Sequence, residues 1–194
     1  MNKAERTKQL IVEKTAPLFN TKGYAGTSIS DMTEATGLTK GSIYGNFENK
    51  DDVALAAFDH NYKKVRDIIR SEMEKKRTIK EKLLVYTQVY DNYMHHPFPH
   101  GGCPILNTAI EADDTHAALK KKAADAIHSW KTLIISLVEK GIASGEMNAS
   151  LNPEQFALTF IAMIEGAIMM AKVTGKPAYR SQVLASVKKF IEAA

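Results

Sequence analysis

The chain has 194 residues, of which 44% are hydrophobic and 25% are charged, enough to bury the core of one domain or two small ones. This composition excludes a disordered chain, a collagen and a disulfide-stapled miniprotein, and the single cysteine, Cys103, can form no internal disulfide. The net charge of +4 comes from residues 61–82, which we interpret as a solvated helix face. Residues 1–60 carry seven basic and eight acidic groups, so bulk charge gives only weak support for nucleic-acid binding.

Helical periodicity runs through almost the whole sequence, with glycine and proline between the periodic segments. Asn2 and Glu5 form an N-cap pair for the first helix, and Gly23 ends it. Pro17 lies inside this helix and predicts a bend. No apolar run reaches the roughly 18 residues of a membrane span, and no apolar signal core begins the chain, so we expect a cytoplasmic location. The fold is predicted to be all-α, with about nine helices over residues 3–22, 28–35, 39–46, 50–76, 78–95, 104–112, 115–143, 153–174 and 178–193.

Residues 27–50 have the form of a helix-turn-helix, in which two short helices meet at Gly37. A glycine at this turn permits a positive φ and a steep crossing of the helices. The second helix would then be free to enter a major groove, with hydroxyls, a cation and an aromatic ring on its outer face. On geometry alone, an ordinary all-α protein explains the pattern equally well. The predicted core is Ile29, Met32, Leu38, Ile43 and Phe47, and the outward residues are Thr39, Lys40, Ser42 and Tyr44.

A specific order of residues strengthens this interpretation: Lys22-Gly23-Tyr24, Thr27-Ser28-Ile29, Asp31-Met32, Gly37-Leu38-Thr39-Lys40-Gly41-Ser42-Ile43-Tyr44 and Phe47-Glu48-Asn49-Lys50-Asp51. The stretch 19–58 that contains it resembles the N-terminal domain of the TetR family of bacterial transcriptional regulators. The resemblance implies phosphate contacts by Thr27, Tyr44 and Lys50. It also implies base contacts near Thr39, Lys40 and Ser42, and it places Ser28 among the DNA-binding residues. Two departures are Thr33, where the family usually has alanine, and Gly45, where a larger polar residue is common.

The resemblance also implies a domain organisation and a function. An N-terminal helix-turn-helix head over residues 1–48 would precede an effector-binding and dimerisation domain over residues 49–194, with helix 49–76 as a shared lever. The expected protein is a homodimeric regulator without enzyme activity, acting as a repressor. It would bind a near-palindromic double-stranded DNA operator and be released by a small, largely hydrophobic effector. No cofactor, metal or membrane partner is expected. A helical ligand carrier that has lost DNA binding is an alternative.

The segment 153–174 is apolar nearly all round and carries small residues that allow close helix approach. By itself it is a buried core helix; the resemblance makes it half of a four-helix dimer interface. The candidate interface residues are Ala162, Gly166, Ala167, Met170, Val187 and Phe190.

Aromatic residues gather in the middle of the chain, where Tyr86, Tyr90 and Tyr93 share one helix face. Such a stripe is more often core than a binding site, but the family encloses its effector in this region. Glu165 lies in an apolar run and must be paired there, either with a structural partner or with an effector. The candidate pocket residues are Tyr86, Tyr90, Tyr93, Phe98, Cys103, Trp130, Met163, Glu165 and Met169.

The cluster of His95, His96, His100 and Cys103 supports the alternative of a small all-α enzyme or a metal-binding protein, although its spacing matches no familiar ligand set. Cys103 also stands at a helix N-cap before Pro104, where thiols can become reactive towards oxidants or electrophiles. The competing interpretation of Cys103 is a small buried hydrophobe. The operator sequence, the effector and the regulated genes are not specified by the sequence.

Overall fold

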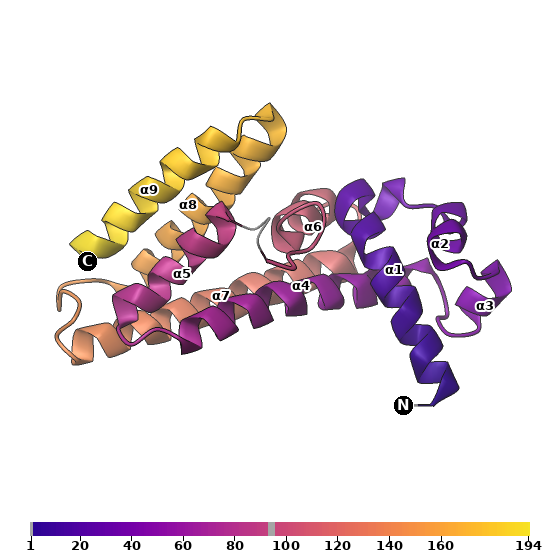
Figure 1. Ribbon diagram of the computed structural model, residues 1–194, viewed down its shortest axis with the longest axis horizontal. Coiled ribbons are helices and arrows are strands. Elements are labelled where there is room, and N and C mark those ends of the chain that lie inside the picture. The colour runs from indigo at the N-terminus through magenta and orange to yellow at the C-terminus, as the bar shows by residue number, and fades with distance from the viewer. Residues whose placement is uncertain (1, 93–95) are drawn as a thin grey trace. The chain divides into compact units, whose positions relative to one another are not determined.

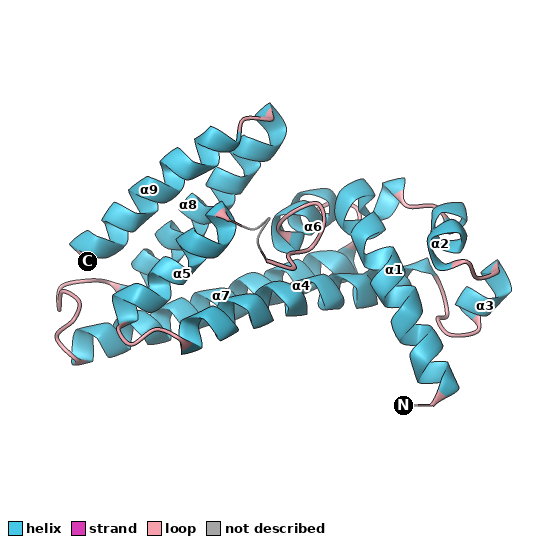
Figure 2. Cartoon of the chain, viewed as in Figure 1, coloured by secondary structure: helices cyan, strands magenta, loops and turns pink. Residues whose placement is uncertain are grey.

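The computed structural model describes residues 2–92 and 96–194, and in this part of the chain helices are joined by loops and turns, without strands (Figure 2). The all-α prediction is confirmed. Helices of the described residues are α1 (Lys3–Gly26), α2 (Ile29–Thr36), α3 (Lys40–Tyr44), α4 (Lys50–Glu74), α5 (Ile79–Asp91), α6 (Pro104–Ala112), α7 (Ala117–Ala143), α8 (Pro153–Thr174) and α9 (Pro177–Ala193). The predicted helix 78–95 ends at Asp91, and Tyr93 and His95 lie outside the described residues.

Local capping chemistry explains where the first helices begin. Asn2 caps α1 and Ser28 caps α2, each through a reciprocal capping box. Helix α1 passes through Pro17 and contains a single non-helical residue, Gly23, with φ of 73° and ψ of 179°. This conformation is open to glycine alone, so the regular helix stops there and the chain turns before α2.

The described chain divides into two compact units, one of residues 1–65 with 99–126 and one of residues 66–98 with 127–194. Helices α4 and α7 each supply residues to both units. The predicted boundary at residue 48 is a functional division and stays a prediction. The compact units divide the chain differently, because α6 and the start of α7 belong to the same unit as the first three helices and α6 packs against α1.

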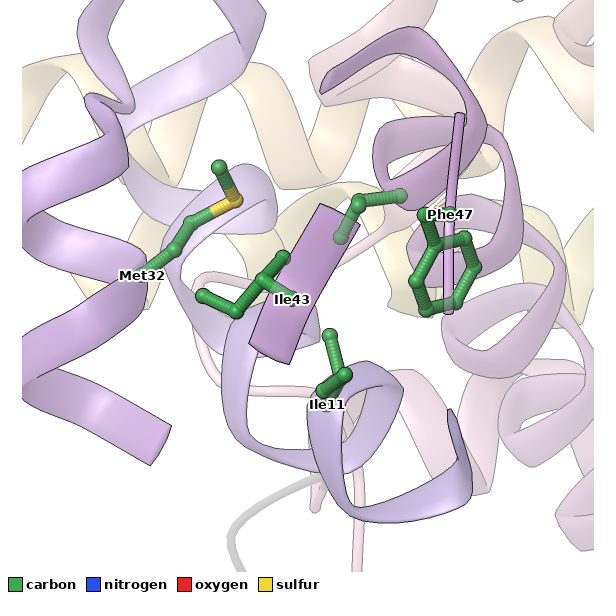
Figure 3. Close-up of a cluster of buried hydrophobic side chains, with 5 residues drawn as sticks. Ile11, Met32, Ile43 and Phe47 are labelled. Atoms are coloured by element: carbon green, nitrogen blue, oxygen red, sulfur yellow. The ribbon is translucent and has the colours of Figure 1, made fainter. Parts of the chain in front are cut away.

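The first unit is organised around a small apolar core between its N-terminal helices. Figure 3 shows Ile11 of α1, Met32 of α2, Ile43 of α3 and Phe47 converging, and Val53 of α4 completes this cluster. All five are 6% exposed or less. The cluster confirms Met32, Ile43 and Phe47 as core residues, and the helix α3 that it supports is only five residues long. Burial of these side chains therefore holds α3 in place, since so short a helix is unstable alone.

The second unit is built on the hairpin of α8 and α9, with α5 packed against it (Figure 1). Gly175 makes this turn in the left-handed conformation, with φ of 66°. By length and composition, α8 could cross a membrane, which the sequence analysis did not expect. Core helices of soluble proteins meet the same criterion, and 44% of the most apolar window of α8 is buried within the chain.

Candidate nucleic-acid interface and effector region

The turn between α2 and α3 has the geometry that the sequence predicts. Gly37 ends α2 in the left-handed region, with φ of 68°. The Thr39 hydroxyl then accepts a hydrogen bond from the Ser42 backbone N–H at 3.1 Å and caps α3. Lys40 follows directly and is exposed. The first turn of α3 thus presents hydroxyls and an ammonium group to solvent, the donors that read bases and phosphates.

Thr27, predicted to contact a phosphate, has its side chain in the interior of the head. Thr27 is fully buried, and its hydroxyl donates to the Gly23 carbonyl oxygen at 2.7 Å. The reversal of the chain at Gly23 turns this side chain inward, where it holds the loop before α2. The neighbouring Ser28 is exposed, but its hydroxyl is engaged as the cap of α2. The Thr27 side chain therefore stabilises the head from inside.

Lys50, the other predicted phosphate ligand, stands at the first residue of α4 and is held by an aromatic ring. Its Nζ lies 4.3 Å from the centre of the Tyr24 ring. The Tyr24 hydroxyl donates to the Asp51 carboxylate, and this hydrogen bond, with burial, raises the pKa of Tyr24 to about 12. Tyr44 is half-buried against the core of the head, so its ring is partly structural.

A carboxylate of α6 binds the backbone directly beside the head. Glu111 accepts hydrogen bonds from the N–H groups of Tyr24 and Ala25, both at 2.9 Å. These N–H groups are available because Gly23 interrupts α1. A Cβ atom on Gly23 would lie 2.3 Å from a Glu111 oxygen, so the glycine is needed for both its φ and its size. Glu111 was not among the predicted site residues, because its partners lie 86 and 87 residues away in the sequence.

A second polar contact joins α1 to the loop before α6. The Asn20 amide donates to the carbonyl oxygens of His100 at 2.7 Å and Gly102 at 3.0 Å. From α6, the Asn107 amide donates to the Gly101 carbonyl oxygen at 3.0 Å and to the carbonyl oxygen of Asn20 at 3.0 Å. Asn20 is only 5% exposed. Its polarity on a helix that packs against others was the one sequence signal for this contact, since buried amides require partners.

Cys103 occupies the N-cap of α6 with Pro104 at the first helical position, as the sequence predicts. It is 1% exposed and forms no disulfide. Among residues 2–92 and 96–194, no group of three His, Cys, Asp or Glu side chains is placed to hold a metal ion. His96 and His100 fall in different compact units, and His95 lies outside the described residues.

Four candidate effector residues come together in the second unit. The Trp130 ring stacks on the rings of Tyr86 and Tyr90, with centroid distances of 5.3 and 6.4 Å, and Phe98 meets Tyr90 edge-on at 5.4 Å. Cys103 belongs to the first unit. The three remaining described candidates for the effector site lie on α8 and differ in exposure. Met163 and Glu165 are half-buried, whereas Met169 is 48% exposed and does not lie in the core.

One face of α8 exposes apolar side chains that have no intrachain cover. The most exposed are Leu158, Met169 and Val173, at 50%, 48% and 81%. Ala162 is also exposed, and Gly166 has no atom within 4 Å of a Cβ built on it. At 100° per residue these positions share one side of the helix. Among the other interface candidates, Met170 is 37% exposed and Phe190 stacks on Phe156 at 4.6 Å.

Two predicted interface residues are wrong as direct contacts. Ala167 and Val187 are fully buried within the chain, so they can support α8 and α9 from inside but cannot touch a partner. Met169, predicted to line the effector region, instead extends the exposed apolar face. The near-uniform hydrophobicity of α8 explains the placement of Ala167 and Met169, because a helix that is apolar all round gives no periodic signal of which side faces inward.

Comparison with known proteins covers both halves of the chain. Residues 11–57 match the model described as "Bacterial regulatory proteins, tetR family", and residues 80–187 match "Tetracyclin repressor-like, C-terminal domain". The chain is similar to a TetR-family transcriptional regulator from Cytophaga hutchinsonii, with 49% identity, a TM-score of 0.96, and 99% of this chain and 96% of that chain covered. It is also similar to a TetR transcriptional regulator from Chloroflexus aurantiacus J-10-FL, with 38% identity and a TM-score of 0.93. That comparison covers 99% of this chain and 97% of the other chain. The HTH-type transcriptional repressor DhaR of Mycobacterium sp. (strain GP1) is 25% identical over 166 residues, covering 86% of this chain and 82% of DhaR.

Proposed function

Because this chain belongs to the TetR family of bacterial transcriptional regulators and is a ligand-responsive DNA-binding regulator, we propose that it acts as a homodimeric cytoplasmic repressor. Two heads would bind successive major grooves of a near-palindromic operator, and a small, largely hydrophobic effector would release them. The observation that carries the DNA-binding proposal is the capped first turn of α3, which exposes Lys40 beside Thr39 and Ser42. Catalysis is not part of the proposed role.

The head provides separate residues for reading bases and for binding phosphates. We assign base contacts to Thr39, Lys40 and Ser42, because the N-terminal turn of a recognition helix faces the groove floor. Phosphate contacts are assigned to Lys50, which the Tyr24 ring orients, and to the helix N-terminus at Ser28. Tyr44 remains a candidate phosphate ligand through its hydroxyl.

The direct test of DNA binding is selection from a random duplex library with the purified full-length protein, followed by sequencing. We expect enrichment of a near-palindromic site whose half-sites are spaced for a two-fold dimer. The selection would be repeated at two salt concentrations, since phosphate contacts make affinity fall with salt. Absence of any enriched sequence at both concentrations would contradict the proposed operator binding.

Lys50→Ala and Lys40→Ala are expected to weaken DNA binding in different ways. Loss of Lys50 should lower affinity for operator and random DNA equally and flatten the slope of log K against log salt by about one unit per head. Loss of Lys40 should cost about 1–3 kcal/mol on the operator and much less on random DNA, if it reaches a base edge. Fluorescence anisotropy titrations on both duplexes measure this. Lys189→Ala, an exposed lysine of α9, is the matched control, and an identical pattern for Lys40 and Lys50 would contradict the assignment.

We assign the effector response to the second unit and its transmission to α4, the lever proposed over residues 49–76. Bound effector would shift the population towards a head separation that no longer fits the operator. The contacts of Glu111 and Asn107 with α1 support a second route of transmission, because they attach α6 to α1.

The apolar face of α8 supports dimerisation, since exposed apolar patches of this kind mark protein interfaces.

The burial of Cys103 predicts a slow thiol. At neutral pH, Cys103 in the folded protein should react with a maleimide reagent at least about ten times more slowly than in the urea-unfolded chain, because buried structural cysteines are inert. Mass spectrometry at timed intervals measures both rates. Equal rates in the two states, together with release of DNA on labelling, would instead support an electrophile-sensing role for Cys103.

A further inference from the structure

Trp130 of α7 is the single tryptophan of the chain and carries an unusual buried polar group. Its side chain is 6% exposed, and within the described residues its indole Nε1 is buried without a hydrogen-bond partner. The ring itself is well packed, with Tyr86 and Tyr90 stacked against it at interplanar angles of 18° and 20°. The apolar ring of Trp130 is therefore packed against its neighbours, whereas its Nε1–H has no hydrogen-bond acceptor among the described residues.

An indole N–H can only donate a hydrogen bond, and buried tryptophans usually find an acceptor for it. Stacking uses the face of the ring, so the tyrosine rings do not occupy the edge that carries the N–H. A buried donor without an acceptor is costly to the folded state. A core assembled only for packing would place phenylalanine here more favourably, so the retained donor points to an acceptor that arrives from outside the chain.

We propose that the Trp130 Nε1–H is the hydrogen-bond donor of the effector site and that the effector is a neutral aromatic compound bearing a carbonyl group; this rests on the proposed effector response. The surrounding rings, which include Phe160 meeting Tyr86 edge-on at 5.3 Å, favour a flat aromatic ligand that can stack or pack edge-on. A neutral acceptor suits a neutral donor, because a buried charged ligand would require a charged partner. The carbonyl would accept the hydrogen bond that the Trp130 Nε1–H does not make to any described residue.

The test compares two probes that differ in one group, 2-acetylnaphthalene with a carbonyl and 2-ethylnaphthalene with a methylene in its place. Calorimetric titration into the full-length dimer should give a dissociation constant about tenfold lower for the acetyl probe, the usual size of one satisfied buried hydrogen bond. In protein labelled with ¹⁵N-tryptophan, the single indole N–H signal should move downfield with the acetyl probe and not with the ethyl probe.

Variants then locate the donor. Trp130→Phe should bring the ratio of the two dissociation constants to about one, since phenylalanine keeps an aromatic ring and removes the N–H. Tyr86→Phe and Tyr90→Phe remove the neighbouring hydroxyl donors and should retain the tenfold ratio. If Trp130→Phe does not fold, the shift of the indole signal in the unsubstituted protein decides the question.

Equal affinities for the two probes, an indole signal unmoved by the acetyl probe, or binding of neither probe up to its solubility would each overturn the inference. These results are independent of the operator selection, because that selection is carried out without any probe. A protein that selects an operator but fails the probe test keeps the proposed DNA-binding function and loses the inferred effector class. A protein that selects no operator contradicts the proposed function, whatever the probes show.

Discussion

Replacing Gly166 with arginine is expected to convert the proposed dimer into folded monomers and to abolish high-affinity operator binding. Nothing in the described chain lies within 4 Å of a Cβ at Gly166, so the new side chain can leave α8 without an intrachain clash. It would project from the exposed apolar face of α8, where a partner would have to bury its charge. A buried unpaired charge costs about 3–5 kcal/mol in each half of a two-fold interface, enough to dissociate most dimers at micromolar concentration.

Sedimentation velocity measures the loss of the dimer, and circular dichroism shows whether the helices persist. Ala143→Arg adds the same charge at an exposed position near the end of α7, outside α8 and α9, and should remain dimeric. Weak DNA binding by the Gly166→Arg monomer should survive, because each head keeps its own core around Ile43. An unchanged dimer would mean that the interface lies away from this face of α8.

Gly23→Ala is expected to lower the free energy of unfolding by about 3 kcal/mol or more, the largest effect of any glycine-to-alanine change in the head. Two costs combine here. The backbone at φ of 73° and ψ of 179° is strained for alanine by about 1–3 kcal/mol. The new methyl group would also displace the Glu111 carboxylate, whose two hydrogen bonds to backbone N–H groups are worth about 1.5–3 kcal/mol each.

Gly37→Ala is the comparison without a steric contact, because Gly37 has a positive φ, in the αL region at φ 68° and ψ 13°, and nothing within 4 Å of an added Cβ. It should therefore show only the conformational penalty, about 1 kcal/mol. A double-mutant cycle completes the test: in the Glu111→Ala background, Gly23→Ala should cost only its backbone penalty of about 1–3 kcal/mol. Urea unfolding of the four proteins of the cycle and of Gly37→Ala gives the values. Additive effects of the Gly23 and Glu111 changes would contradict the contact between them.

Much of the head could be predicted because its structure is set by local chemistry. Asn2 was expected as a cap and the next two helices were expected to begin at residues 28 and 39; Asn2, Ser28 and Thr39 cap these three helices, since a cap needs only a side chain and a backbone N–H a few residues on. Gly37 was expected at positive φ for the same reason. The order of residues from Gly37 to Lys50 was specific enough to identify the family, and the comparisons confirm it.

Residues that the sequence analysis misplaced depend on packing between distant segments. Thr27 was assigned to DNA by its position, but the reversal at Gly23 buries it. On α8, Ala167 faces inward and Met169 outward, which an all-apolar helix does not reveal before it packs against α5 and α9.

By itself, then, the sequence determined the helices, their caps and the family, because those depend on contacts within a few residues. Only the tertiary structure decided which side of each helix is buried and that Glu111 binds the end of α1. Contacts between residues 86 and 87 positions apart form only when folding brings the elements together, and no local preference encodes them.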